Sequence, residues 1–278
     1  MNQLPLEKRA QIINLLVEGS SLRATSRITG CSINTVSKLL VDVGKACLKF
    51  HDEKVVNVNS KKIQCDEIWS FCYSKQKNVP DNKIGEAGDL WTWTAIDADS
   101  KLMVSWFVGN RDIDSANIFM EDVAYRLKNR VQLTTDGLKV YLEAVNNNFG
   151  KEIDYAQLIK LYGDNGSVGN EKRYSPAECN GTKKHNVSGN PDKKHVSTSY
   201  IERQNLTMRM HMRRFTRLTN AFSKKIENHC YAVALFMVFY NFAKIHKTLR
   251  VTPAMEAGLT QDIMSIEEIV LLTEKYSN

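Results

Sequence analysis

Three acidic residues, each in a different local setting, are the side chains of this sequence best suited to catalysis. Asp66 lies within the strand-like run Ile63–Phe71, Asp136 closes the apolar run that begins at Val131, and Glu202 lies in a basic helix-forming segment. Carboxylates brought together from separate elements repel one another and lose hydration, which is costly unless a cation compensates them. Pairs of divalent ions held in this way are a recurring solution for phosphodiester chemistry. The three residues therefore predict a metal-dependent enzyme that acts on nucleic acid.

The surrounding pattern predicts elements that could bring these carboxylates together. Alternating and apolar runs predict three successive antiparallel strands, followed by a helix, a strand, a helix, a strand and a helix. The expected elements are strands 63–73, 90–97 and 101–109, helix 115–129, strand 131–135, helix 138–149 and strand 155–162. This order is that of a ribonuclease-H-like core. In such a sheet the first strand is central and the fourth lies beside it, so Asp66 and Asp136 can converge, and Glu202 from a packed helix completes the set.

The later part of the chain is predicted to be a long loop followed by helices. Residues 163–199 are rich in Gly, Asn, Lys and Ser and have few apolar side chains, which is typical of a loop. Helices are expected at 200–217, 220–245 and 263–276. A loop of this length in a compact domain is usually functional or disordered.

The amino-terminal segment has the spacing of a helix-turn-helix module. Three short helices are predicted over residues 5–48, with a tight turn at Gly30 and Ser32 as the N-cap of the third helix. Asn34, Thr35 and Lys38 would then lie on the outward face of that helix and could reach DNA. The alternative is a purely structural three-helix module.

Positive charge is concentrated in one part of the sequence. Residues 182–250 contain fourteen Lys or Arg and three acidic residues, which is +11 in a chain whose net charge is +7. The remaining residues are therefore net acidic. A polarised distribution of this kind fits a surface that binds a polyanion backbone better than it fits general solubility.

Several classes of protein are disfavoured by composition. A hydrophobic share of 42% suits a globular core, and no apolar run is long enough for a transmembrane helix. The six cysteines are dispersed without a CxxC pair, which predicts reduced thiols rather than a zinc site or disulfides. The amino terminus lacks a signal-peptide layout. We therefore expect a cytoplasmic, nucleoid-associated protein with no membrane partner and no small-molecule substrate.

Over about residues 63–258 the chain resembles the DDE transposases of bacterial insertion sequences, and most closely the insertion-sequence-one family. The motifs that carry the resemblance are Cys65–Phe71, Gly88–Asp97, Thr134–Gly137, His195–Arg209, Arg214–Asn220, Tyr240–Phe242 and Thr252–Met255. Members of that family often have a cysteine-rich zinc motif before the helix-turn-helix, and this sequence has none. Recognition of the element ends is therefore expected to depend on the helical module alone.

The resemblance implies a catalytic triad of Asp66, Asp136 and Glu202 that holds two Mg²⁺ ions, with Mn²⁺ able to substitute. It also implies hydrolysis at the ends of an element, followed by strand transfer into a target. The implied partners are double-stranded DNA and further copies of the chain in an oligomer on DNA. The expected DNA contacts are Asn34, Thr35, Lys38, His195, Arg203, Arg209, Arg213 and Arg214.

Simpler interpretations remain open for the individual residues and for the whole chain. Arg209, seven residues after Glu202, could hold a phosphate or be an ordinary surface arginine, and His195 could be an inert loop histidine. The chain could also be a DNA-binding regulator derived from a transposase, or a metal-dependent nuclease that cuts without joining. The intact set of three carboxylates argues against the regulator.

These expectations divide the chain into four parts. Residues 1–50 are expected to form the helix-turn-helix module and 51–62 a linker. Residues 63–250 are expected to form the ribonuclease-H-like catalytic domain, with a mixed five-stranded sheet, helices and the loop insertion 163–199. Residues 251–278 are expected to be a helical tail. The fold class is thus α+β or α/β.

Overall fold

A mixed sheet forms the centre of the computed structural model, which describes residues 3–163, 179–216 and 219–276. Among these residues the sheet has six strands in the order β3-β2-β1-β4-β5-β6. The strands are β1 (Lys62–Cys72), β2 (Gly88–Asp97), β3 (Met103–Gly109), β4 (Gln132–Thr135), β5 (Asp154–Tyr162) and β6 (Cys179–Ser188). The first strand is therefore central and the fourth lies beside it, as expected from the sequence.

Strand direction divides the sheet into two halves. β1, β2 and β3 are successive antiparallel neighbours. β4 is parallel both to β1 and to β5. β6 then returns antiparallel to β5 at the edge. Parallel neighbours need a crossover, and α4 (Ile113–Arg126) and α5 (Val140–Phe149) supply the crossovers into β4 and β5.

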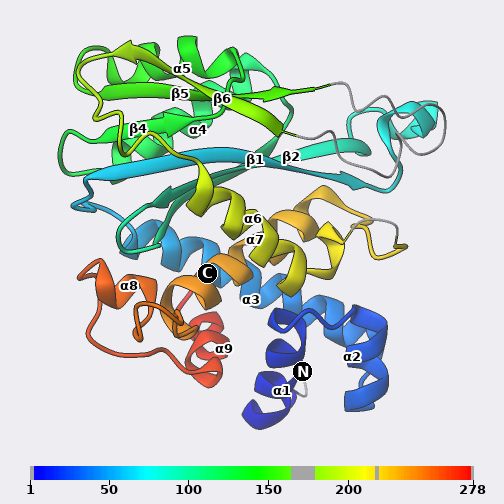
Figure 1. The fold of residues 1–278 in the computed structure, drawn as a ribbon. Helices are drawn as coiled ribbons and strands as arrows, with labels where there is room; N and C mark the ends of the chain where they lie inside the picture. Colours follow the sequence, from blue (N-terminus) through cyan, green and yellow to red (C-terminus); the bar gives the residue numbers. More distant parts are fainter. Residues whose placement is uncertain (1–2, 164–178, 217–218, 277–278) are drawn as a thin grey trace.

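Helices cover both faces of the sheet (Figure 1). α4 and α5 lie on one face, and α3 (Ile33–Lys54), α6 (Ser199–His211) and α7 (Ile226–Val238) lie on the other. The bounds of the remaining helices are α1 (Leu6–Val17), α2 (Leu22–Thr29), α8 (Pro253–Glu256) and α9 (Ile266–Lys275). Short 3₁₀ turns occur at Gln76–Asn78, Asp81–Lys83 and Arg213–Phe215, and α7 ends in a π-helical turn at Phe239–Ala243.

The sequence predicted five strands, and the described part of the structure has a sixth. This strand, β6, lies inside the predicted loop 163–199. Each residue of Cys179–Ser188 is exposed or half-buried, so the strand has no buried face and no apolar alternation. It is held by main-chain pairing with β5, which a pattern of side chains cannot reveal. Residues 164–178 of the predicted loop lie outside the described residues.

Several predicted helix boundaries also need correction. α4 ends at Arg126 and not at residue 129. α6 ends at His211 and not at Arg217, which itself lies outside the described residues. α7 begins at Ile226 and not at residue 220. α9 begins at Ile266, because Ser265 and Glu268 form a capping box that sets its start.

The amino-terminal helices occur where they were expected. Gly30 ends α2 in the left-handed conformation at φ 69°, and the Ser32 side chain accepts a hydrogen bond from Thr35 N at the start of α3. α3 is longer than expected and continues to Lys54. A Cβ on Gly44 would lie 2.4 Å from Tyr231 O, so α3 and α7 pack closely at this point. These contacts do not test whether the helices bind DNA.

The structure also bears on the cysteines and on the search for a membrane-spanning helix. All six cysteines are free. Across the described ranges, each helix is too short or too polar to span a bilayer.

Candidate metal centre

Parallel pairing of β1 with β4 brings Asp66 close to Asp136. Parallel pairing ends where Gln64 meets Thr134. Asp66 and Asp136 each lie two residues beyond this last pair, Asp66 within β1 and Asp136 directly after β4. Carboxylate oxygens of Asp66, Glu67 and Asp136 all lie within 4.8 Å of one another. The structure thus brings two of the three predicted acids together and adds a third that was not predicted.

Burial and mutual repulsion make this cluster electrostatically strained. Burial, together with the charges of Glu67 and Asp136, raises the pKa of Asp66 to about 7. Burial raises the pKa of Asp136. The hydrogen bond that Leu138 N–H donates to Asp136 Oδ1 at 3.0 Å acts in the opposite direction but does not cancel this effect. Burial likewise raises the pKa of Glu67. Hard divalent cations prefer oxygen ligands, and a cation bound here would compensate the carboxylate charges that burial and repulsion disfavour.

Glu67 belongs to this centre although it follows Asp66 directly. Alternation along β1 starts its side chain toward the opposite face, but its carboxylate still lies within 4.8 Å of those of Asp66 and Asp136. Glu67 Oε1 accepts from Arg111 Nε at 2.8 Å, and Oε2 accepts from Tyr141 at 3.2 Å. The Arg111 guanidinium also stacks over Trp91, 4.6 Å from the ring centroid. The same alternation hides Glu67 from a sequence argument, because it predicts that Glu67 points away from Asp66.

Helix α6 is anchored to the centre by two side-chain amides. Gln64 Oε1 accepts from the backbone N–H groups of Tyr200 and Ile201 at 2.9 and 3.2 Å, which holds the first turn of α6 against β1. Asn205 Nδ2 donates to Asp66 Oδ2 at 2.8 Å. Asn205 Oδ1 is buried and has no hydrogen-bond partner among the described residues. Asn205 was not among the predicted site residues, yet its position three residues after Glu202 places both on one helical face.

Glu202 lies near the cluster, but its carboxylate is engaged elsewhere. Its Oε1 lies 2.6 Å from Lys160 Nζ and also accepts a hydrogen bond from Thr198 Oγ1. Glu202 lies outside the group of oxygens that are within 4.8 Å of one another. Its charge nevertheless contributes to the raised pKa values of Asp66 and Asp136. Lys160 on β5 thus balances the third predicted acid in this structure.

The predicted DNA contacts on α3 lie on its first turns. Asn34 and Thr35 are exposed, and Lys38 is paired with Asp42. Thr35 and Lys38 also line a groove of about 1010 Å³ beside α3, together with Tyr231 of α7. The exposure of Asn34 and Thr35 fits the predicted role without testing it.

The predicted basic contacts around α6 differ in their surroundings. Arg203 and Arg213 are exposed, whereas Arg209 is half-buried. Arg214 Nη1 donates to Ser223 Oγ and to Asn228 O, both at 2.9 Å, and burial lowers the pKa of Arg214 to about 10. The guanidinium of Arg214 is therefore engaged within the protein. His195 is exposed, with its Nε2 3.7 Å from Asp192 Oδ2.

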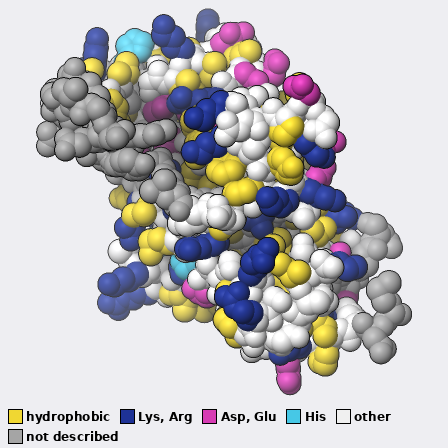
Figure 2. Space-filling model, turned by 90° about the vertical axis from the view of Figure 1, so that its right-hand side faces the viewer, with side chains coloured by type: hydrophobic (Ala, Val, Ile, Leu, Met, Phe, Trp, Pro, Cys, Tyr) yellow, Lys and Arg dark blue, Asp and Glu magenta, His cyan; other side chains and the backbone are white. Residues whose placement is uncertain are grey.

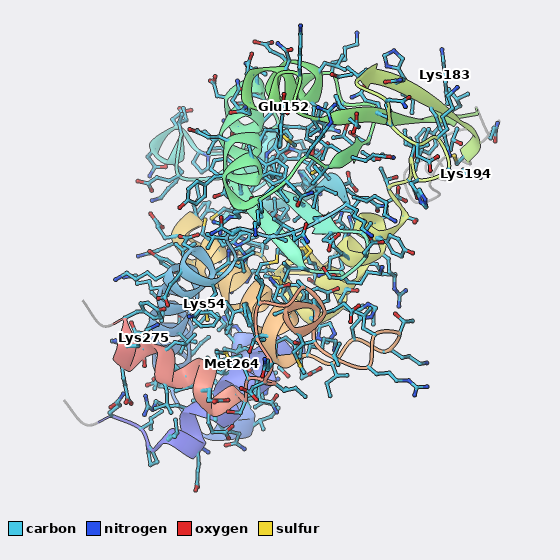
Figure 3. The ribbon with its side chains drawn as sticks, turned by 90° about the vertical axis from the view of Figure 1, so that its left-hand side faces the viewer. Lys54, Glu152, Lys183, Lys194, Met264 and Lys275 are labelled. Carbon is cyan, nitrogen blue, oxygen red and sulfur yellow. The ribbon has the colours of Figure 1, made fainter. Side chains whose placement is uncertain are left out.

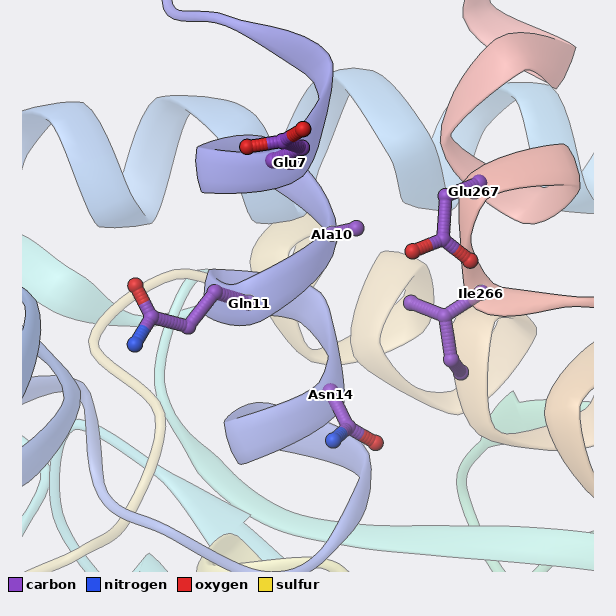
Figure 4. A pocket seen from close by; sticks show the side chains of 6 residues that line it. All are labelled: Glu7, Ala10, Gln11, Asn14, Ile266 and Glu267. Carbon is purple, nitrogen blue, oxygen red and sulfur yellow. The ribbon is translucent and has the colours of Figure 1, made fainter.

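The right-hand side of the molecule in Figure 1, where β1 ends, faces the viewer in Figure 2. Lys and Arg side chains lie across the middle of this face. A separate hollow of about 290 Å³ lies between α1 and α9, away from the sheet (Figure 4). Glu7, Gln11, Asn14 and Glu267 supply its polar lining, and none of the predicted site residues reaches it. The predicted acidic residues lie instead on or directly after β1, β4 and α6.

The fold and the site define a mixed α and β protein with a cluster of oxygen donors suited to a divalent cation. No protein-family model matches the chain, and no curated protein matches it in sequence. Among solved structures, it is similar to a cryo-EM structure of a piggyBac transposase synaptic complex with hairpin DNA. That similarity has a TM-score of 0.45 and 7% identity, and covers 97% of this chain and 70% of that chain. A likeness at this level assigns neither a family nor an activity to the present chain.

Proposed function

We propose that this chain is a DDE-type transposase with a ribonuclease-H-like catalytic core. The observation that carries the proposal is that the parallel neighbours β1 and β4 bring carboxylate oxygens of Asp66 and Asp136 within 4.8 Å of each other, while Glu202 lies on the adjacent helix α6. The strand order β3-β2-β1-β4-β5 agrees with the order expected for that core. Edge strand β6 is an addition to it.

The residues of the centre fit the divalent ions that such a reaction uses. Asp66 and Asp136 would hold Mg²⁺ or Mn²⁺, with Glu202 as the third ligand. The set contains only oxygen donors, and Arg111 and Lys160 are the cations whose charges act on it within the described part of the chain. When bound, the ions would supply charge compensation and activation of the attacking hydroxyl or water.

The side chains around the acids have separable tasks in this proposal. Asn205 and the Glu67 N–H hold the two oxygens of Asp66 in place. Arg111 and Tyr141 hold Glu67. Lys160 holds Glu202 and must release it before that carboxylate can join Asp66 and Asp136. In-line displacement at phosphorus needs no covalent enzyme intermediate. The residues of this centre therefore have only to position the reacting groups and to balance the negative charge that develops on them.

The finer parts of the proposal rest on sequence motifs. They comprise membership of the insertion-sequence-one family and recognition of element ends by Asn34, Thr35 and Lys38 on α3. They also comprise phosphate contacts from His195, Arg203, Arg209 and Arg213, and an oligomer that pairs two ends on double-stranded DNA.

A strand-transfer assay tests the proposal directly. Purified protein is incubated with labelled element-end DNA, target DNA and Mg²⁺ or Mn²⁺, beside the Asp136→Asn variant. We expect joined products with the native chain and none with the variant. The variant should still bind the end DNA, because the change removes a metal ligand and leaves the basic surface intact.

Other outcomes would lead to different conclusions. Joined products from Asp136→Asn at the native rate would exclude a metal role for Asp136. Cleavage without joining by the native chain would favour a nuclease. Binding without chemistry in any divalent metal would favour a regulator derived from a transposase.

A further inference from the structure

The pairing of β5 with β6 places two lysines on the face of the sheet that α6 covers. Lys160 is paired with Thr182, and Leu158 is paired with Lys184. Paired residues and those two positions apart share a face, so Lys160 and Lys184 lie on the same one. The ion pair between Lys160 and Glu202 identifies this face as the one beside the acidic cluster.

The segment that leads from β6 to α6 crosses the same face. Val196 is buried against Ala156 and Leu158 of β5. Lys184 Nζ donates to Lys193 O at 2.5 Å, which ties the strand to this segment. Lys184 is nevertheless exposed, as is most of β6. The segment thus presents cationic side chains beside the route to the acidic cluster.

The charge of this region is almost entirely positive. Residues 179–195 include four lysines and one acidic residue, Asp192. Lys183 and Lys194 lie at the same edge of the molecule, on and beside β6 (Figure 3). Neighbouring strands are about 4.8 Å apart, so the site-side lysines of β5 and β6 continue outward from the carboxylates of β1 and β4. An acidic centre flanked by a basic wall suits a phosphodiester chain, whose backbone the wall would neutralise.

We propose that the site-side face of β5 and β6, formed by Lys160, Lys184 and the segment 193–195, binds the sugar–phosphate backbone of the DNA strand that enters the acidic cluster. This inference rests on the proposed function and assigns a role to β6. It is separate from end recognition by α3, which lies on a different element.

Adjacent lysines on β6 provide a matched test. Lys184→Gln removes a positive charge from the site-side face, and Lys183→Gln removes the same charge from the opposite face. The affinity of the full chain for a short mixed-sequence DNA duplex, and for one of its strands, is measured over a series of KCl concentrations. Removing one lysine–phosphate interaction reduces the slope of log Kd against log salt by about 0.9 for a duplex or 0.7 for a single strand. We expect this reduction for Lys184→Gln and an unchanged slope for Lys183→Gln.

The outcomes separate this inference from the proposed function. A reduced slope in Lys184→Gln alone supports the inference. Equal reductions in both variants, or no reduction in either, overturn it. If the native chain shows metal-dependent cleavage and Lys184→Gln leaves the slope unchanged, only the assignment of β6 fails. If the native chain binds neither probe, both proposals fail.

Discussion

Asp66 is held by hydrogen bonds that favour its charged form, in surroundings that disfavour it. The Glu67 N–H donates to Oδ1 at 2.9 Å and Asn205 donates to Oδ2 at 2.8 Å. Burial and the neighbouring carboxylates outweigh these bonds, and the pKa of Asp66 rises to about 7. The residue is therefore positioned for a cation and is strained in the absence of one.

This strain predicts a pH dependence of stability for the metal-free protein. The pKa of Asp66 is higher in the folded than in the unfolded chain, so the folded chain binds more protons between about pH 4 and pH 7. The free energy of unfolding should therefore fall as pH rises through this window. The free energy of unfolding of Asp66→Asn, relative to that of the native chain, should therefore increase by on the order of 2 kcal/mol from pH 5 to pH 8.

Denaturant unfolding of both proteins with EDTA at the two pH values measures this difference. Added Mn²⁺ at pH 8 should stabilise the native chain more than the variant, which serves as the control for metal binding. A difference between the two proteins that is the same at both pH values would exclude titration of Asp66 as its cause.

At the scale of elements, the short helix Arg213–Phe215 places neighbouring arginines in opposite environments. Arg213 is exposed, whereas Arg214 is bonded to Ser223 and Asn228. The sequence predicted that both would contact phosphates, because it shows only two adjacent cations. Which of them faces solvent depends on how the turn packs against α7.

These environments predict different effects of the same substitution. Arg213→Gln should reduce the slope of log Kd against log salt by about one and leave the free energy of unfolding unchanged. Arg214→Gln should lower the free energy of unfolding by about 1–3 kcal/mol, because it removes two hydrogen bonds from a charged donor, to Ser223 Oγ and Asn228 O. DNA titrations and denaturant unfolding of both variants give the comparison. A reduced slope in Arg214→Gln at native stability would instead assign a phosphate contact to that residue.

At the scale of the whole molecule, the amino-terminal helices and the sheet share one core. A continuous cluster of buried side chains extends from Ile13 of α1 through β1 to Leu272 of α9. Gly44 stands at the close contact of α3 with α7. Packing at this point therefore affects the whole chain and not only its first helices.

Gly44→Ala tests this coupling. In an exposed helix, replacing Gly by Ala stabilises by about 1 kcal/mol. Here the added Cβ would meet the Tyr231 backbone, and we expect a net loss of about 1–3 kcal/mol from overpacking. Asn34→Ala, at an exposed position of the same helix, is the control. Calorimetry should show one lowered transition for Gly44→Ala, and a native or raised melting temperature would contradict the close packing of α3 and α7.

The sequence by itself determined most of the main-chain elements and the elements that carry the predicted acidic residues. Asp66 in a strand, Asp136 at the end of a strand and Glu202 on a helix could be recognised because periodicity, caps and breakers act over a few residues. Only the tertiary structure decided that Glu67 joins Asp66 and Asp136. It also decided that Asn205 donates a hydrogen bond to Asp66 and that Lys160 forms an ion pair with Glu202. Those contacts depend on strand register and helix packing between residues far apart in the chain, which local patterns do not encode. For the same reason β6 could not be predicted, since its pairing with β5 uses main-chain groups that every residue carries.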